Sequence, residues 1–227
     1  MDVPVLCVEC EGVLVETASA RRAALADALA AEGLTLDEAT WTAVRHLAVE
    51  PGAMRARERL GAPEDGTAVT LAVLRAEQAF ADRIARGVTL TPALLPTVER
   101  LSAVARLAIV SRAARRELEA LLAQAGCAGL FRPVLGAEDL TAGLPAAWKQ
   151  AVARTPGHLP DQRRRPVVVS DALEVVRAAR GAALGTILIG ARPAHEALEA
   201  DLWLESLADL TPDRLRALHR SLLGDRP

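Results

Sequence analysis

The 227-residue sequence has few aromatic side chains, three cysteines and a single lysine. Aromatic residues make up 2% of the chain and tyrosine is absent, whereas apolar residues make up 51%, so the core must be packed from Ala, Leu and Val. Lys149 is the only lysine among 27 basic residues. Because the formal net charge is only −2, there is no electrostatic case for binding nucleic acid or an anionic membrane.

The cysteines do not predict a disulfide framework, because their number is odd and low. Cys7 and Cys10 spell a C-x-x-C motif, but they fall in the apolar run VPVLCVEC, which predicts a strand. A redox motif of this kind opens a helix, and a zinc site needs a second pair. We therefore expect neither redox nor zinc chemistry at these residues.

No targeting segment or membrane span is predicted. The chain enters its first strand after Met1 and Asp2, with no basic segment and cleavable apolar stretch, and no apolar run approaches the roughly 20 residues that span a bilayer. The expectation is a soluble, cytoplasmic protein. The basic run at 163–165 predicts a solvated loop. The four histidines follow no metal-ligand spacing with one another: His46, His158, His195 and His219.

Short apolar runs alternate with helical patterns, which predicts an α/β domain with a parallel sheet. The predicted strands are Val3–Val8, Ala105–Val110, Phe131–Leu135, Val167–Ser170 and Thr186–Ile189. The predicted helices between and after them are Ala114–Gln124, Ala146–Ala153, Leu173–Ala183 and Pro212–Leu223, the last with Thr211 as its cap.

The stretch from 18 to 87 interrupts this alternation, because it contains helical patterns and no strand. Helices are expected at Ala20–Ala31, Leu36–Ala48 and Ala68–Ala85, with Pro51-Gly52 and the segment 61–63 as breaks. The expected organisation is a core at 1–17 and 88–227 with a helical insertion at 18–87. An insertion after the first strand lies at the carboxyl ends of the strands, where open α/β sheets place ligands.

Five segments in this order resemble the haloacid dehalogenase-like superfamily, within it the subgroup of phosphoglucomutases and phosphoglycolate-type phosphatases. VECEGVLVET resembles its first motif, F-D-x-D-G-hydrophobic-L-hydrophobic-D-T, and GLP stands where the family has G-K-P. The segments are Val8–Thr17, Leu107–Gly126, Glu138–Ala151, Val167–Gly190 and Ala200–Thr211. The resemblance implies a Rossmann-like core with parallel sheet, flanked by helices, and an all-helical cap inserted after the first strand.

The resemblance places altered carboxylates at the catalytic positions. Glu9 stands at the nucleophile position and Glu11 at the acid/base position, both where the family has Asp. Gly12, a candidate substrate-binding residue, stands where a glycine makes the turn of the chain easy. Each Asp-to-Glu change keeps the charge but moves the carboxylate by roughly 1 Å, a misplacement that can cost on the order of 10²-fold in rate. In the family these groups act with Mg²⁺, so Glu9, Glu11 and Asp171 become the candidate metal ligands.

The phosphate-binding groups are only partly kept. Ser111 supplies the expected hydroxyl, which also suits an ST-turn or a helix cap, and Arg112 follows it within reach of a phosphate. Leu144 occupies the lysine position. Lys149 is a candidate replacement if its side chain leans back toward the helix N-terminus. Arg75 in the insertion is a candidate substrate-binding residue, with a helix ion pair to its neighbours as the alternative.

In the segment Val167–Gly190, the resemblance implies two acidic residues directly after a strand, the fourth motif of the family. This chain has Ser170-Asp171 there, so one of the two is missing. Asp171 suits either a metal ligand or a helix N-cap, and Glu174 suits a second carboxylate or a solvent-facing position. The favoured function is a weak or non-catalytic relative of the phosphohydrolases that binds a small phosphorylated molecule or a protein partner. The alternatives are an active Mg²⁺-dependent phosphatase or phosphomutase with Glu9 as nucleophile, and other acid–base chemistry by Glu9 and Glu11.

Overall fold

The computed structural model describes residues 4–45, 47, 49–157, 166–191 and 193–223. The chain divides into two compact units. The core unit comprises 1–15 and 90–227, and the helical unit comprises 16–89. The division therefore falls two residues from each boundary expected from the sequence, within β2 (Val15–Glu16) and β3 (Thr89–Leu90), which pair with each other as the chain passes between the units.

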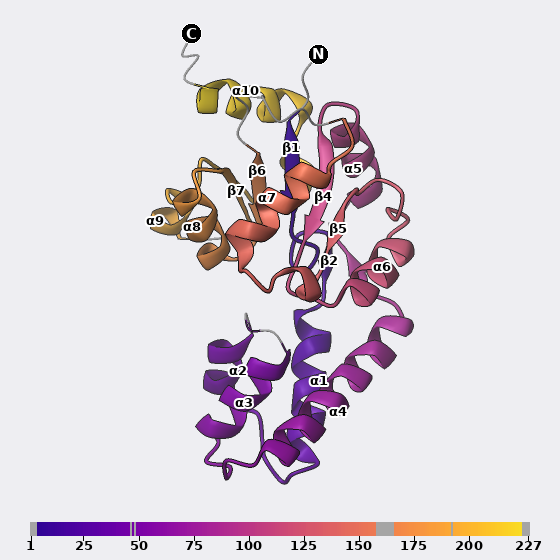
Figure 1. Cartoon of the computed structure of the whole chain (residues 1–227), viewed down its shortest axis with the longest axis vertical. Helices are drawn as coiled ribbons and strands as arrows, with labels where there is room; N and C mark the ends of the chain where they lie inside the picture. Colours follow the sequence, from indigo (N-terminus) through magenta and orange to yellow (C-terminus); the bar gives the residue numbers. More distant parts are fainter. Residues whose placement is uncertain (1–3, 46, 48, 158–165, 192, 224–227) are drawn as a thin grey trace. The chain divides into compact units, whose positions relative to one another are not determined.

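The core unit holds a six-stranded sheet in the order β5-β4-β1-β6-β7-β8, and every neighbouring pair is parallel (Figure 1). The strands are β1 (Val5–Val8), β4 (Arg106–Val110), β5 (Val134–Leu135), β6 (Val167–Ser170), β7 (Gly185–Ile189) and β8 (Leu202–Leu204). The chain builds outward from β1 on one side through β4 and β5, then returns to β6 on the other side. The carboxyl end of β1 is thus the switch point at which such sheets place ligands.

Both faces of the sheet are covered, as the unbroken apolar strands predict. In β1, Val5 and Cys7 join one core cluster, while Leu6 and Val8 point to the opposite face and are equally buried. Trp148 is the largest side chain of the first cluster and is 1% exposed. The predicted fold class, a parallel α/β core with a helical insertion, is confirmed.

The helices of the core unit follow the predicted periodicity with small changes at their ends. They are α5 (Leu94–Ser102), α6 (Arg115–Gln124), α7 (Leu144–Arg154), α8 (Leu173–Gly181), α9 (Ala194–Ala197) and α10 (Pro212–Leu223), with 3-10 turns at Ala137–Asp139 and Leu207–Asp209. Thr211 accepts a hydrogen bond from the Arg214 amide at 3.2 Å, so the predicted cap of α10 is confirmed. The sequence patterns did not predict α5 and α9.

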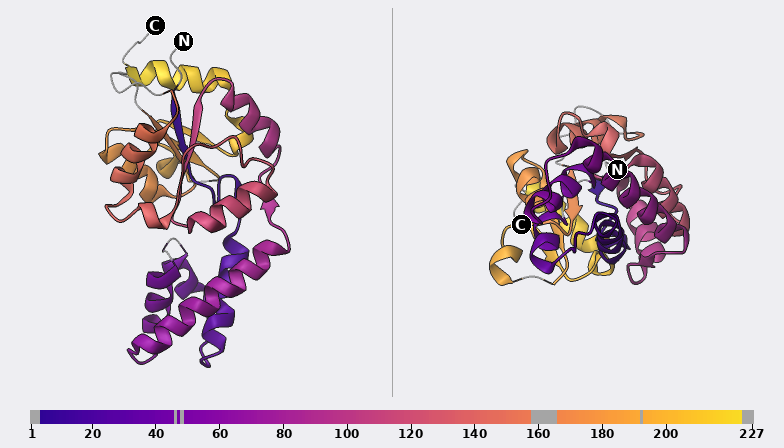
Figure 2. Two further views of the ribbon diagram at one scale, coloured as in Figure 1. Left: turned by 45° about the vertical axis from the view of Figure 1, so that its right-hand side comes forward. Right: turned by 90° about the horizontal axis from the view of Figure 1, so that it is seen from below.

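The helical unit contains α1 (Ala18–Ala30), α2 (Glu38–Val44), α3 (Val49–Arg59) and α4 (Gly66–Ala85). Helices α1 and α4 pack side by side (Figure 2). The prediction of one helix over 36–48 and a break at Pro51-Gly52 was wrong, because α3 begins at Val49 and runs through both residues. Pro51 lies in the first turn of α3, where a backbone N–H has no partner within the helix and its loss costs nothing.

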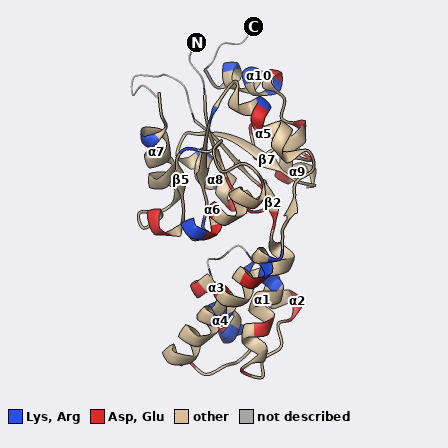
Figure 3. Ribbon diagram, turned by 90° about the vertical axis from the view of Figure 1, so that its right-hand side faces the viewer, with Lys and Arg blue, Asp and Glu red and all other residues tan. Residues whose placement is uncertain are grey.

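Charged residues of both signs are interspersed within each unit (Figure 3), in keeping with the net charge of −2. Among the described residues, no helix is long and apolar enough to cross a membrane. The basic run at 163–165, His46 and His158 lie outside the described residues.

Adjacent residues of α7 give a direct test of how this helix packs. We expect Trp148→Ala to lower the free energy of unfolding by about 3–5 kcal/mol, because it leaves a cavity among the strands. Lys149→Ala is the matched control: Lys149 is exposed, so the change is expected to stay within about 0.5 kcal/mol. Urea denaturation of both variants measures the difference, and equal losses would contradict the packing of α7.

Candidate functional site

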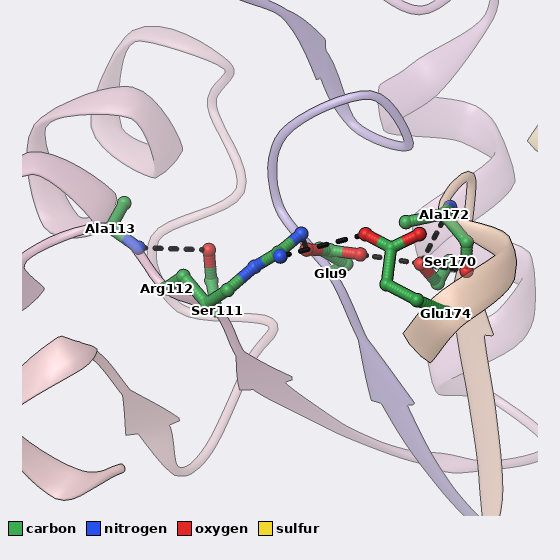
Figure 4. A network of polar contacts seen from close by, with 7 residues as sticks. All are labelled: Glu9, Ser111, Arg112, Ala113, Ser170, Ala172 and Glu174. Atoms are coloured by element: carbon green, nitrogen blue, oxygen red, sulfur yellow. Dashed lines mark hydrogen bonds and ion pairs between the residues drawn. The ribbon is translucent and has the colours of Figure 1, made fainter. Parts of the chain in front are cut away.

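Polar side chains gather at the carboxyl ends of three neighbouring strands of the core sheet (Figure 4). Glu9 directly follows β1, Ser111 directly follows β4, and Ser170 is the last residue of β6. Glu9 still takes part in the sheet, because its amide donates to the Val169 carbonyl at 2.9 Å. The parallel topology therefore brings together residues that are far apart in the sequence, at the edge where such sheets bind ligands.

The carboxyl group of Glu9 is buried and held on both oxygens. Glu9 is 8% exposed. The Ser170 hydroxyl donates to its Oε2 at 2.5 Å, and an Arg112 guanidinium nitrogen lies 3.4 Å from its Oε1 (Figure 4). The Ser170 oxygen is itself oriented by the Ala172 amide, which donates to it at 2.9 Å. We call Glu9, Ser170 and Arg112 the Glu9 network.

Burial raises the pKa of Glu9 to about 7, from an ordinary value of 4.5. Arg112 and the Ser170 hydrogen bond oppose this rise, whereas the charges of Asp171 and Glu11 add to it. The predicted carboxylates therefore lie close enough to act on Glu9 electrostatically. Because desolvation is the largest cause, the neutral form of Glu9 is favoured in the folded protein over a wider pH range than in water.

The turn after β1 depends on Gly12 and Asp171. Gly12 has a φ of +76°, and its amide donates to the Val15 carbonyl at 2.8 Å, which closes the loop. A Cβ on Gly12 would collide with the carboxylate of Asp171. The need for glycine at this turn is confirmed, and the reason is the Asp171 carboxylate as much as the backbone angle.

Asp171 is not the N-cap of α8, so that interpretation was wrong. The capping position is Ala172, and no side chain caps this helix. The carboxylate of Asp171 instead lies against Gly12 in the turn.

Ser111 is buried, and its oxygen accepts from the Ala113 amide at 3.4 Å in an ST-turn. It does not cap α6, whose capping residue is Ala114. Arg112 reaches past Glu9 to Glu174, with 3.6 Å between the guanidinium and the carboxylate. Glu174, half exposed, is thus an ion-pair partner of Arg112. The sequence did not indicate this pairing, because it suggested Arg112 only as a phosphate ligand.

The remaining predicted residues are not drawn into the network. Lys149 is exposed on α7, and its expected catalytic part stays a prediction. Leu144, at the lysine position of the family, packs against the apolar core cluster. Arg75 is exposed on α4 in the helical unit, and its part in substrate binding also stays a prediction. Cys7 is buried in β1, and burial raises the pKa of its thiol to about 12, which agrees with an inert core cysteine.

Among the described residues, the contacts of Glu9 disfavour a Mg²⁺ ion at its carboxylate. Within the ranges that the structure describes, no three acidic, His or Cys side chains are arranged to hold a metal ion. Both oxygens of Glu9 already have partners, and the guanidinium of Arg112 supplies a positive charge between Glu9 and Glu174. Mg²⁺ demands near-ideal octahedral oxygen ligands, and an arginine at this place opposes a second cation.

Comparison with solved structures finds matches along nearly the whole chain. β-Phosphoglucomutase from Clostridium difficile has a TM-score of 0.84 at 13% identity, over 98% of this chain and 100% of that one. CbbY from Rhodobacter sphaeroides, solved in complex with phosphate, has a TM-score of 0.75 at 21% identity, over 92% and 96%. A haloacid dehalogenase-like protein from Agrobacterium tumefaciens has a TM-score of 0.70 at 21% identity, over 96% of this chain and 99% of that one.

The chain has the haloacid dehalogenase-like fold. No model of a protein family matches it, and no curated protein matches it significantly by sequence. At such low identities the likeness establishes the haloacid dehalogenase-like fold and leaves the chemistry to the residues of the Glu9 network.

The raised pKa of Glu9 makes stability depend on pH. Because the folded state holds this proton more tightly than the unfolded state, the stabilisation is complete below about pH 4.5 and is lost as pH rises through about 7. Glu9→Gln has no ionisable group at this position, so only the parent loses this stabilisation as pH rises. The free energy of unfolding of Glu9→Gln minus that of the parent is therefore expected to increase by at most about 3 kcal/mol between pH 4.5 and 8. Urea denaturation in EDTA at both pH values measures it, and a difference that does not vary with pH would contradict the burial of the charge.

The turn at Gly12 is tested by two glycine substitutions with nearly the same φ. Gly33 has a φ of +74°, and a Cβ added there would meet nothing within 4 Å, so Gly33→Ala carries backbone strain alone, about 1 kcal/mol. Gly12→Ala adds the collision with Asp171, and we expect a loss of about 2–4 kcal/mol. Thermal or urea unfolding compares the two, and equal losses would show that Asp171 does not lie against Gly12.

Proposed function

We propose that this protein is a weak or non-catalytic relative of the phosphohydrolases, which binds a ligand at the carboxyl end of β1 and does not turn over phosphate esters efficiently. The observation that carries the proposal is the Glu9 network: the residue at the nucleophile position is buried and engaged by Ser170 and Arg112 on its two oxygens. A carboxylate so engaged is a weaker nucleophile, because either oxygen would have to give up its hydrogen bond or ion pair to attack phosphorus.

The missing positive charges support the same proposal. Phosphoryl transfer relies on cations that offset the repulsion between an attacking carboxylate and a phosphate group. Here Leu144 stands where the G-K-P motif has lysine, and its side chain packs against the core. Arg112 is the cation of the network, but it is shared between Glu9 and Glu174.

The ligand we propose for this site is a small phosphorylated molecule, held weakly. Arg112 is 28% exposed, so its guanidinium is open to solvent on one side, and the Ser111 hydroxyl lies at the neighbouring strand end. An anion there would compete with Glu9 and Glu174 for the guanidinium. We therefore expect weak binding, because Arg112 already pairs with the carboxylates of Glu9 and Glu174.

Turnover assays decide between this proposal and an active enzyme. With a broad panel of phosphate monoesters and Mg²⁺, we expect hydrolysis by the purified protein no faster than by Glu9→Gln. Hydrolysis that saturates, disappears with EDTA and is lost in Glu9→Gln would contradict the proposal and favour a Mg²⁺-dependent phosphatase with Glu9 as nucleophile.

A restored variant is the positive control for the same assay. It combines Glu9→Asp, Glu11→Asp, Leu144→Lys and Ser170→Asp, which return the residues of the family motifs. We expect this variant to gain Mg²⁺-dependent hydrolysis of at least one ester by about 10²-fold or more over the parent, the size of the misplacement cost. If the parent and the folded restored variant were equally active, these four positions would not be what limits catalysis.

A further inference from the structure

Arg112 pairs with two carboxylates that differ in their exposure to solvent. Its guanidinium lies 3.4 Å from the buried carboxylate of Glu9 and 3.6 Å from that of Glu174, whose side chain is 49% exposed. Figure 4 shows the Glu174 side chain turned toward Arg112 from the first turn of α8. Because ion pairs exposed to water contribute little stability, Glu174 is the partner that a ligand arriving from solvent displaces at the lower cost.

The surroundings of Glu174 show what it would need after such a displacement. Arg177, one turn further along α8, also lies near it. The pKa of Arg177 is raised first of all by its hydrogen bonds to Glu199, at 2.6 and 2.7 Å, and least by the charge of Glu174. Arg177 is therefore held mainly by Glu199. A ligand that takes Arg112 would leave the Glu174 carboxylate in a place where a new cation is favourable.

Charge balance decides which phosphorylated ligands suit this exchange. Among the described residues, the charges that act on the Glu9 carboxyl are one cation, Arg112, and two carboxylates, Asp171 and Glu11. A phosphate dianion would enter a set of groups that already has more negative than positive charge, and it would repel the displaced Glu174 carboxylate. A ligand that also carries an ammonium group replaces this repulsion with an attraction.

We propose that the ligand of this site is a phosphomonoester that carries a primary ammonium group. Its phosphate pairs with Arg112 and its ammonium pairs with Glu174, so two ion pairs replace the single pair between these residues. This inference rests on the proposed function, because it names the chemical class of the phosphorylated ligand proposed there.

Calorimetric titration of the full chain with three probes tests the inference. The buffer contains EDTA and little salt, at about pH 8, where phosphate monoesters are mainly dianions. O-Phosphoethanolamine has both charged groups, propyl phosphate has a methyl group in place of the ammonium, and ethanolamine lacks the phosphate. We expect phosphoethanolamine to bind at least about tenfold more tightly than either of the others, because each of them loses one ion pair.

The outcomes distinguish this inference from the proposed function. Equal affinities for phosphoethanolamine and propyl phosphate would overturn the role of the ammonium group and leave the proposed function standing. Saturable binding of neither ester would overturn both. Ethanolamine that binds as tightly as phosphoethanolamine would overturn the phosphate contact.

Glu174→Gln tests the partner of the ammonium group. The variant removes the carboxylate that competes for Arg112, so propyl phosphate is expected to bind more tightly than to the parent. Phosphoethanolamine should lose its advantage, with the two affinities within about threefold of each other. Both the variant and its control change side chains that are not buried, so both are expected to fold.

Glu119→Gln is the matched control, because Glu119 is an exposed residue of α6 outside the Glu9 network and the change removes the same charge. Its preference for phosphoethanolamine is expected to equal that of the parent. A preference that survives in Glu174→Gln, or that is lost equally in Glu119→Gln, would overturn the pairing of the ammonium group with Glu174.

Discussion

A carboxyl group removed from water at the end of a central strand is the constraint around which the core site is built. Glu9 lies 8% exposed at the switch point of a parallel sheet. A buried carboxylate needs hydrogen bonds and a compensating charge, or it takes up a proton. Ser170 supplies a hydrogen bond and Arg112 supplies the opposite charge. Because the pKa of Glu9 is still raised to about 7, these two partners only partly offset the removal of the carboxylate from water.

The substitutions at the site are complementary in size and charge. Compared with the motifs that the sequence resembles, Glu9 is one methylene longer and Ser170 lacks a carboxylate, and the Glu9 carboxylate accepts a hydrogen bond from the Ser170 hydroxyl. Arg112 adds a positive charge beside Glu9, 3.4 Å from one carboxylate oxygen. These changes form one consistent arrangement, and this coupling is why we propose altered function instead of a damaged enzyme.

The fold could be predicted from the sequence because apolar runs and helical periods report burial directly. The motif alone placed a glycine at position 12. The sequence could not show that a Cβ there would collide with the Asp171 carboxylate. The contacts of the site also lay beyond local pattern: the hydrogen-bond partner of Glu9 is 161 residues away in Ser170, and the pairing of Arg112 with Glu174 depends on where α8 begins. Likewise, α3 runs through Pro51-Gly52 because Pro51 falls in the first turn of the helix, where its missing N–H costs nothing.

Calorimetric titration of the parent protein with Mg²⁺ at pH 8, alone and with inorganic phosphate, tests the central claim most directly. At that pH Glu9 is mainly ionised, so protonation does not mask a metal site. The account predicts no saturable heat of Mg²⁺ binding, since Arg112 and Ser170 already hold the Glu9 carboxylate. Saturable Mg²⁺ binding that is lost in Glu9→Gln would contradict it.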